Sequence, residues 1–308
     1  MGKQSKRGRY ASKKRSITPL LMRIAVILLI IDVFAMGMVY RNRQASRTEF
    51  AQMAAAVQEA RQEAPAAPET EAAPVAETLP STEPATEGEV STEAPTEEAT
   101  EATEVTEPPL DPELEKVLKP YRQFYQENKD MVGWLSIEGT AIEYPVMHTP
   151  EDPEKYLHTG FTGDYSYAGV PFLDYRCTED SDNLLIYGHN MSDGSMFNEL
   201  VEYRLKSYWR EHPTIRFDSL YEEREFVVFA AFYDRVYYTH EPNFRFYDFI
   251  DAKSKTEYQN AVKKFKEKSE YNTELTPEYG QQLVMLVTCT YREDNGRFVV
   301  VGYEKPKT

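Results

Sequence analysis

The chain has 308 residues, enough for one or two domains, and a formal net charge of −16. Basic residues crowd the first fifteen positions, whereas acidic residues crowd roughly residues 59–107. Nucleic-acid binding is excluded as a main role, because it needs a clustered basic face and the basic run here adjoins an apolar segment. Two cysteines, Cys177 and Cys289, are too few for a disulfide framework but allow a single disulfide.

The N-terminal region reads as a membrane anchor. Residues 1–18 form a basic tail, and residues 19–40 form an apolar run that is long enough to cross a bilayer. Asp32 within this run costs about 2.5 to 3.5 kcal/mol, which the many large apolar residues offset. The positive-inside rule predicts a cytoplasmic tail, one transmembrane helix and an extracellular remainder. The alternative is a cleaved signal peptide, although no small-x-small cleavage site follows the run closely.

The next segment, residues 41–110, is predicted to be a disordered tether. From about Gln58 to Pro109 it repeats Glu, Thr, Ala and Pro, with almost no large side chains to bury. Self-repelling glutamates and frequent prolines extend such a chain. We therefore expect the tether to hold the following domain away from the bilayer.

Residues 111–308 are predicted to form the folded domain. Asp111 and Pro112 indicate the start of a short helix, with a second helical stretch at 121–128. An amphipathic helix is expected between about 252 and 270, and another short one around 195–200. Short β-rich runs separated by turn residues favour a barrel; they lie at 133–137, 141–147, 169–174, 183–187, 214–220, 225–233, 282–291 and 297–303.

Two candidate reactive residues follow apolar strands. Cys289 ends the run 282–291 at a strand-to-loop edge, although a free cysteine is often only an inert core residue. His189 follows the run 183–187 and enters a loop of Gly, Asn, Ser and Asp, where a side chain can meet a substrate. The other histidines are interpreted as ordinary structural or surface residues: His148, His158, His212 and His240.

The sequence predicts no metal site. No pair of His or Cys residues has the spacing of metal ligands. The acidic loop 178–182 lacks a recognisable calcium pattern and reads as a solvated loop.

Arg297 begins the last strand, eight residues after Cys289, and two geometries are open. A tight turn at Asn295-Gly296 would separate the two side chains by roughly 16 Å along the strands. An open loop at 290–296 would make them neighbours. Taken alone, Arg297 is interpreted as a solvent-exposed residue of a strand.

The motifs together resemble class B sortases over residues 111–308. "LVTCTY", with Leu286 two places before the Thr-Cys pair, and "GRFVVVGY" are similar to the sortase signature. "VGWLSIEGTAIEYPVMHTPEDPEKYLHTGF", "YAGVPFLDYR" and "NLLIYGHNMSDGSMFNEL" resemble the preceding strands and histidine loop. The resemblance implies a mainly β fold, a closed barrel of about eight strands with an N-terminal helical segment and a long helix before the cysteine strand.

The same resemblance implies a function and roles. Cys289 would be the nucleophile, His189 the general acid and base, and Arg297 the stabiliser of the oxyanion, while Thr288 would help bind substrate. A membrane-anchored enzyme of a Gram-positive cell would cleave the sorting signal of secreted proteins through a thioester. It would join the new carboxyl end to an amine of a cell-wall precursor or a pilus subunit. No cofactor is implied.

Other interpretations remain open at this point. A papain-like protease would place its cysteine before its histidine, which is the reverse of the order here. A non-catalytic surface module on a tether would leave Cys289 dispensable. Cys177, in a polar stretch, reads as a spare thiol, and a disulfide to Cys289 would abolish the nucleophile.

Overall fold

The structure is a computed structural model that describes residues 18–63 and 111–306. Almost all of the basic tail and residues 64–110 of the expected tether lie outside the described residues.

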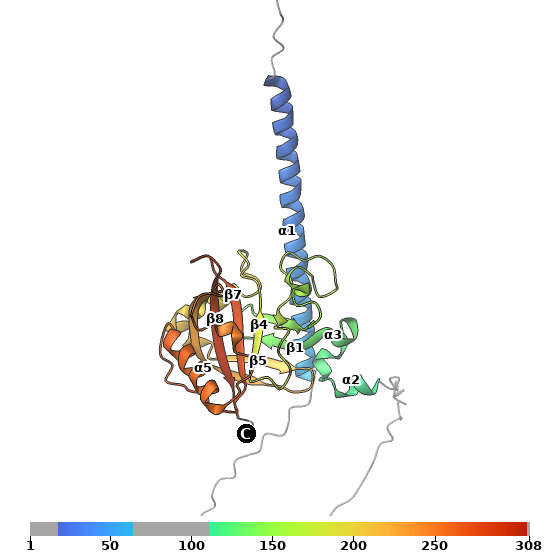
Figure 1. The fold of residues 1–308 in the computed structure, drawn as a ribbon. Helices are drawn as coiled ribbons and strands as arrows, with labels where there is room; N and C mark the ends of the chain where they lie inside the picture. Colours follow the sequence, from blue (N-terminus) through green and yellow to red (C-terminus); the bar gives the residue numbers. More distant parts are fainter. Residues whose placement is uncertain (1–17, 64–110, 307–308) are drawn as a thin grey trace, which may run out of the picture.

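Eight strands close into a barrel, which confirms the predicted fold (Figure 1). Their order around the barrel is β1-β2-β3-β4-β7-β8-β6-β5. The strands are β1 Met131–Ser136, β2 Glu143–Met147, β3 Phe172–Leu173, β4 Asn183–Tyr187, β5 Thr214–Ser219, β6 Glu225–Arg235, β7 Leu283–Cys289 and β8 Gly296–Glu304.

The central strands form the most buried part of the barrel. β4 and β7 run parallel and carry almost continuous apolar residues, as expected for strands that are covered on both faces. β8 pairs antiparallel with both β7 and β6. Because β4 and β7 are parallel, the loops that follow them leave the barrel at the same end.

Short helices and 3₁₀ turns precede and connect the strands. Asp111 caps α2 (Pro112–Lys116) by accepting a hydrogen bond from the Glu113 amide, as predicted, and α3 (Arg122–Glu127) follows after the 3₁₀ turn η1 (Lys119–Tyr121). Further 3₁₀ turns are η2 Lys155–Leu157, η3 Glu199–Arg204 and η4 Phe246–Asp248.

The amphipathic helix is α5 (Lys255–Lys268). Its apolar face is buried as the spacing predicted, and Phe265 stacks on Phe232 of β6 with ring centroids 6.1 Å apart. The short helix expected around 195–200 is wrong in position: η3 begins only at Glu199, and α4 (Lys206–Glu211) follows it. Met196 has a φ of 58°, which is incompatible with a helix through this point.

The N-terminal helix α1 (Thr18–Glu63) is much longer than the expected membrane span. Its first half projects beyond the barrel with exposed apolar side chains, and its second half lies against the barrel (Figure 1). Residues 41–63, assigned above to the tether, are therefore helical and packed. The physical reason is an apolar stripe at helical spacing, formed by Phe50, Met53 and Val57, all buried.

The end of α1 is attached through a buried carboxylate. Asp218 on β5 is fully buried and accepts hydrogen bonds from Arg61 (3.0 Å), Tyr121 (2.5 Å) and Arg216 (2.9 Å). Higher on the helix, the rings of Phe50 and Tyr144 meet edge to face at 5.3 Å. These contacts join α1 to β2, β5 and η1.

Candidate active site

Parallel strands bring the candidate cysteine and histidine to one end of the barrel. Tyr187 of β4 pairs with Val287 of β7, and His189 and Cys289 each lie two residues further along. Gly188 donates its amide proton to the Val287 carbonyl at 3.1 Å, which continues the ladder by one residue. The two strand ends thus deliver an imidazole and a thiol to the same loop cluster.

Arg297 is the direct cross-strand partner of Cys289. The open-loop geometry is correct, and the tight turn at Asn295-Gly296 is wrong. Asn295 does adopt a left-handed conformation, with a φ of 57°, but it directs the chain into β8 rather than forming the tip of a hairpin. Gly296 is required because a Cβ there would lie 2.9 Å from the carbonyl oxygen of Thr290.

Hydrogen bonds hold the two loops together. The hydroxyl of Thr288 donates to the carbonyl of Gly188 at 2.8 Å, and Asn190 donates from Nδ2 to the carbonyl of Cys289 at 2.9 Å. Asn198 in turn donates to Oδ1 of Asn190 at 2.7 Å. The hydroxyl of Thr288, the candidate substrate-binding residue, is thus hydrogen-bonded to the loop that carries His189. Asn190 positions the cysteine loop, a role that the sequence pattern does not indicate.

His189 is oriented by a backbone carbonyl. Its Nε2 lies 2.9 Å from the carbonyl oxygen of Leu157. Because a carbonyl oxygen only accepts, Nε2 carries the proton, and Nδ1 is left to gain or release a second one.

A second histidine covers His189. The rings of His158 and His189 stack with centroids 5.4 Å apart and an interplanar angle of 25°. The pKa of His189 is lowered below its ordinary value, first by burial and further by the neighbouring His158, while the hydrogen bond to Leu157 opposes the change. The sequence predicts only an ordinary role for His158, because this residue lies in an irregular loop with no periodic signal.

The three candidate residues line one pocket of about 420 Å³. Its walls are mostly aromatic and aliphatic and include Phe172, Tyr187 and Tyr247. A mostly apolar cleft with a few convergent polar groups is typical of a ligand site. The thiol, the imidazole and the guanidinium can act on a carbonyl that lies in this pocket.

Cys177 is a free, buried thiol, as expected for a spare cysteine. Only 1% of its surface is exposed, and its sulfur lies 3.4 Å from the carbonyl oxygen of Asn183. Burial raises the pKa of the Cys177 thiol to about 12. Cys289 is also free and only partly buried, so of the two thiols it is the one that a substrate can reach.

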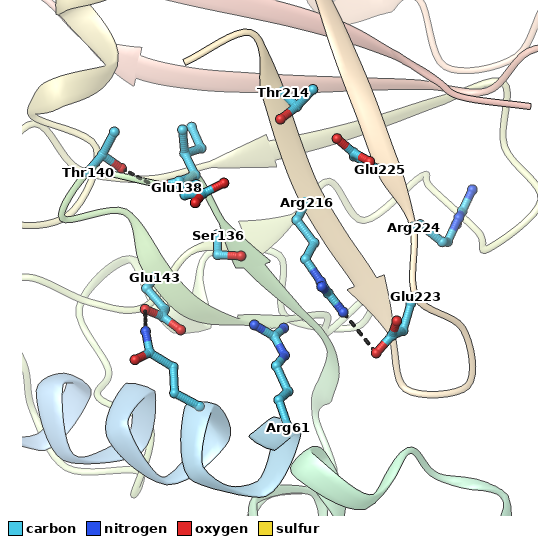
Figure 2. Close-up of a pocket in the computed structure, with 13 residues that line it drawn as sticks. Arg61, Ser136, Glu138, Thr140, Glu143, Thr214, Arg216, Glu223, Arg224 and Glu225 are labelled. Carbon is cyan, nitrogen blue, oxygen red and sulfur yellow. Dashed lines mark hydrogen bonds and ion pairs between the residues drawn. The ribbon is translucent and has the colours of Figure 1, made fainter. Parts of the chain in front are cut away.

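A second pocket, of about 640 Å³, lies between the end of α1, the β1–β2 turn and the β5–β6 turn (Figure 2). Charged side chains of both signs surround it, and Arg216 is paired with Glu223 at 2.9 Å. Its lining contains no thiol, hydroxyl–imidazole pair or other activated nucleophile among the residues described. This pocket is larger than the first but lacks its chemistry.

Comparisons with known proteins agree with the barrel fold. The family model for the sortase domain matches residues 135–305, more than half of the chain, and the chain belongs to the sortase family. It is a class B sortase, and hence a cysteine transpeptidase of the cell surface. The interpretation as a non-catalytic surface module is therefore not supported.

The similar proteins cover the folded domain. Sortase B of Listeria monocytogenes is 34% identical over 187 residues, which cover 59% of this chain and 72% of that protein. Sortase B of Staphylococcus aureus is 30% identical over 192 residues, which cover 61% and 75% of the two chains. The crystal structure of sortase B from Bacillus anthracis superposes with a TM-score of 0.55 at 32% identity, covering 62% of this chain and 86% of that one.

Proposed function

We propose that Cys289, His189 and Arg297 carry the transpeptidation reaction. The observation that carries this proposal is the direct pairing of Cys289 with Arg297 beside His189, with all three lining one pocket. A nucleophile, a proton carrier and a cation are the groups that acyl transfer needs. Each comes from the end of a strand, which keeps its backbone fixed.

In the first half-reaction the Cys289 thiolate attacks the carbonyl carbon of the scissile peptide bond. Arg297 stabilises the negative charge that develops on the carbonyl oxygen. The C–N bond then breaks, and the leaving amine takes a proton from the His189 imidazolium. A thioester and a neutral His189 remain.

In the second half-reaction an amine attacks the thioester carbonyl. His189 takes the proton that this amine loses, the C–S bond breaks, and the Cys289 thiolate returns. The products are a new peptide bond and the enzyme in its starting protonation state.

We further propose that α1 is a single-pass membrane anchor and that the barrel lies outside the cell. The described part of α1 is long and apolar enough to cross a bilayer between residues 22 and 40, and this part makes no contact that buries it. Seven lysines and arginines precede residue 16, whereas three arginines lie between residues 41 and 47. The larger positive charge favours the N-terminus on the cytoplasmic side.

The substrates would be secreted proteins that carry a C-terminal sorting signal, and the acceptor would be an amine of a cell-wall precursor or of a pilus subunit. The apolar, aromatic walls of the pocket suit an extended peptide, with backbone polar groups directed to Arg297. This proposal applies to a Gram-positive cell envelope and needs no cofactor, because the three side chains supply all of the proton and charge transfers.

The test is a ligation assay on the full chain in detergent. A library of quenched peptides is incubated with and without an amine acceptor such as triglycine, and the products are identified by mass. We expect a ligated product that depends on the acceptor and is lost in Cys289→Ala but retained in Cys177→Ala. Hydrolysis alone at every acceptor concentration would contradict transpeptidation.

A further inference from the structure

The helix α1 leaves the barrel at the end that carries the candidate active site. Asn42 donates from Nδ2 to the carbonyl of Tyr165 at 2.9 Å and accepts from the amide of Tyr167 at 2.8 Å. Ser46 and Ser166 share a buried hydrogen bond of 3.0 Å between their hydroxyls. These contacts attach the loop 158–167 to the helix immediately after its apolar run.

The distance from this loop to the end of the apolar run is short. Tyr40 is the last residue of that run, and α1 continues without a break through Asn42. At about 1.5 Å per residue, Tyr40 and Asn42 differ in height by only about 3 Å. If residues 19–40 span a bilayer, the loop 158–167 must therefore lie at the level of the lipid headgroups.

The same loop touches the site. His158 stacks on His189, and the rings of Tyr165 and Tyr167 lie 6.3 Å and 6.4 Å from the His158 ring. One short series of packed rings thus leads from the edge of the membrane span to the candidate histidine.

Two further exposed tyrosines lie in the loops that follow β6 and β7. Tyr291 follows Cys289 and is 91% exposed, and Tyr238 follows β6 and is 61% exposed. Arg235, the last residue of β6, pairs with Gly296 next to Arg297, so these loops share the site's end of the barrel. In Figure 1 the free part of α1 projects from the end of the barrel opposite to the one at which β8 ends.

The chemistry of these loops fits a phospholipid surface. Tyrosine is enriched where membrane and water meet, because its ring is apolar and its hydroxyl is polar. Arg43 lies over the Tyr167 ring at 4.9 Å, and Arg41 and Arg47 follow the apolar run on the same helix. Guanidinium groups at this level can pair with lipid phosphates.

We propose that the active-site end of the barrel rests on the phospholipid surface, with Tyr165, Tyr167, Tyr238 and Tyr291 in the headgroup layer. This inference rests on the proposed membrane anchoring of α1. It differs from the arrangement expected from sequence, in which a long tether holds the domain away from the bilayer. A substrate that is itself held at the membrane surface would reach Cys289 without leaving that surface.

Depth measurements on the full chain in phosphatidylcholine vesicles test this arrangement. In a Cys289→Ala background, which leaves only the buried Cys177, single cysteines replace Tyr238 or Tyr291 and carry an environment-sensitive fluorophore. Tyr279→Cys is the matched control, because Tyr279 is 49% exposed and precedes β7 at the opposite end of the barrel. Lipids with a spin label on the headgroup then quench fluorophores that lie near the surface.

We expect several-fold stronger quenching at 238 and 291 than at 279. Quenching at 238 and 291 that does not exceed the quenching at 279 would overturn the proposal. The readout needs no turnover and is made in Cys289→Ala, so it is independent of the proposed catalytic roles. Strong quenching together with a parent chain that does not ligate peptides would contradict the catalytic roles and leave this orientation standing, whereas an active parent chain without the quenching difference would overturn the orientation alone.

A second pair of variants tests whether α1 sets the orientation. Replacing both Asn42 and Ser46 by alanine removes the side-chain hydrogen bonds to the loop, and we expect it to weaken the quenching at 291. Gln44→Ala is the control, because Gln44 is exposed on the same turn of the helix. Unchanged quenching in the double variant would contradict a role for these contacts.

Discussion

Cys289 and Arg297 are direct partners across the β7–β8 ladder. Residues that face each other in this way have Cβ atoms about 4.5–5.5 Å apart and point to the same side of the sheet. In the free protein Arg297 donates from one terminal nitrogen to the carbonyls of Gly296 at 2.9 Å and Asn295 at 3.3 Å. A guanidinium has five donors, so others remain for a substrate oxygen beside the thiol.

The first prediction concerns this guanidinium. Arg297→Lys keeps the positive charge but loses the planar fork, and we expect kcat to fall by about 10²–10³-fold, as for the loss of one oxyanion donor. Steady-state kinetics on the preferred peptide measure it. The matched control is Arg292→Lys in the same loop, since Arg292 lies over the Tyr233 ring at 4.4 Å. A kcat within twofold of the parent value for Arg297→Lys would remove Arg297 from the mechanism.

The second prediction concerns the stacked imidazoles. His158→Phe keeps a ring over His189 but removes a group that lowers the His189 pKa, so that pKa should rise toward its ordinary value. A higher pKa means that His189 keeps its proton up to a higher pH. The limb of the pH–rate profile that reports loss of the His189 proton should therefore move to higher pH.

NMR titration of the histidine side chains in the full chain gives the same answer without turnover. Cys289, Arg297, Asp174 and Glu154 also line the pocket and stay unchanged in this variant. His240→Phe is the control, because His240 stacks on Tyr238 instead of His189. An unmoved His189 midpoint in His158→Phe would show that His158 has no electrostatic effect on His189.

Much of the fold could be predicted because its signals are local and periodic. The residues of β4 follow from a short continuous apolar run between turn residues, and the buried face of α5, which includes Tyr258 and Phe265, follows from helical spacing. The packing of α1 was missed, although Phe50, Met53 and Val57 carry the same kind of signal, because the Glu- and Pro-rich composition that begins soon afterwards dominated the interpretation of residues 41–110.

The site was harder to predict than the barrel. The Asn295-Gly296 pair is a good turn signal, and its left-handed Asn is present, but the closing loop is set by contacts of Gly296 with Thr290 and Glu293. The stacking of His158 on His189 depends on how an irregular loop folds, and no spacing in the sequence encodes it.

The third prediction concerns the attachment of α1 to the barrel. Asp218→Ala leaves Arg61 and Arg216 without their buried partner, and we expect the free energy of unfolding to fall by about 3 to 5 kcal/mol. Urea denaturation in detergent, followed by tryptophan fluorescence, measures this loss, because Trp134 lies opposite Asp218 in the β1–β5 ladder. Glu63→Ala should change the stability by less than about 0.5 kcal/mol, because its pair with Lys119 is exposed. Equal stability of the two variants would contradict a structural role for the cluster.

The proposed reaction requires that Cys289 form a thioester with a sorting-signal peptide. Its most direct test is intact-mass spectrometry of the full chain in detergent, mixed with a peptide library and then with hydroxylamine. We expect an acyl adduct that maps to Cys289, leaves Cys177 unmodified and is released by hydroxylamine as a hydroxamate. Two results would contradict this thioester: turnover of a peptide without any adduct on Cys289, or full activity of the Cys289→Ala variant.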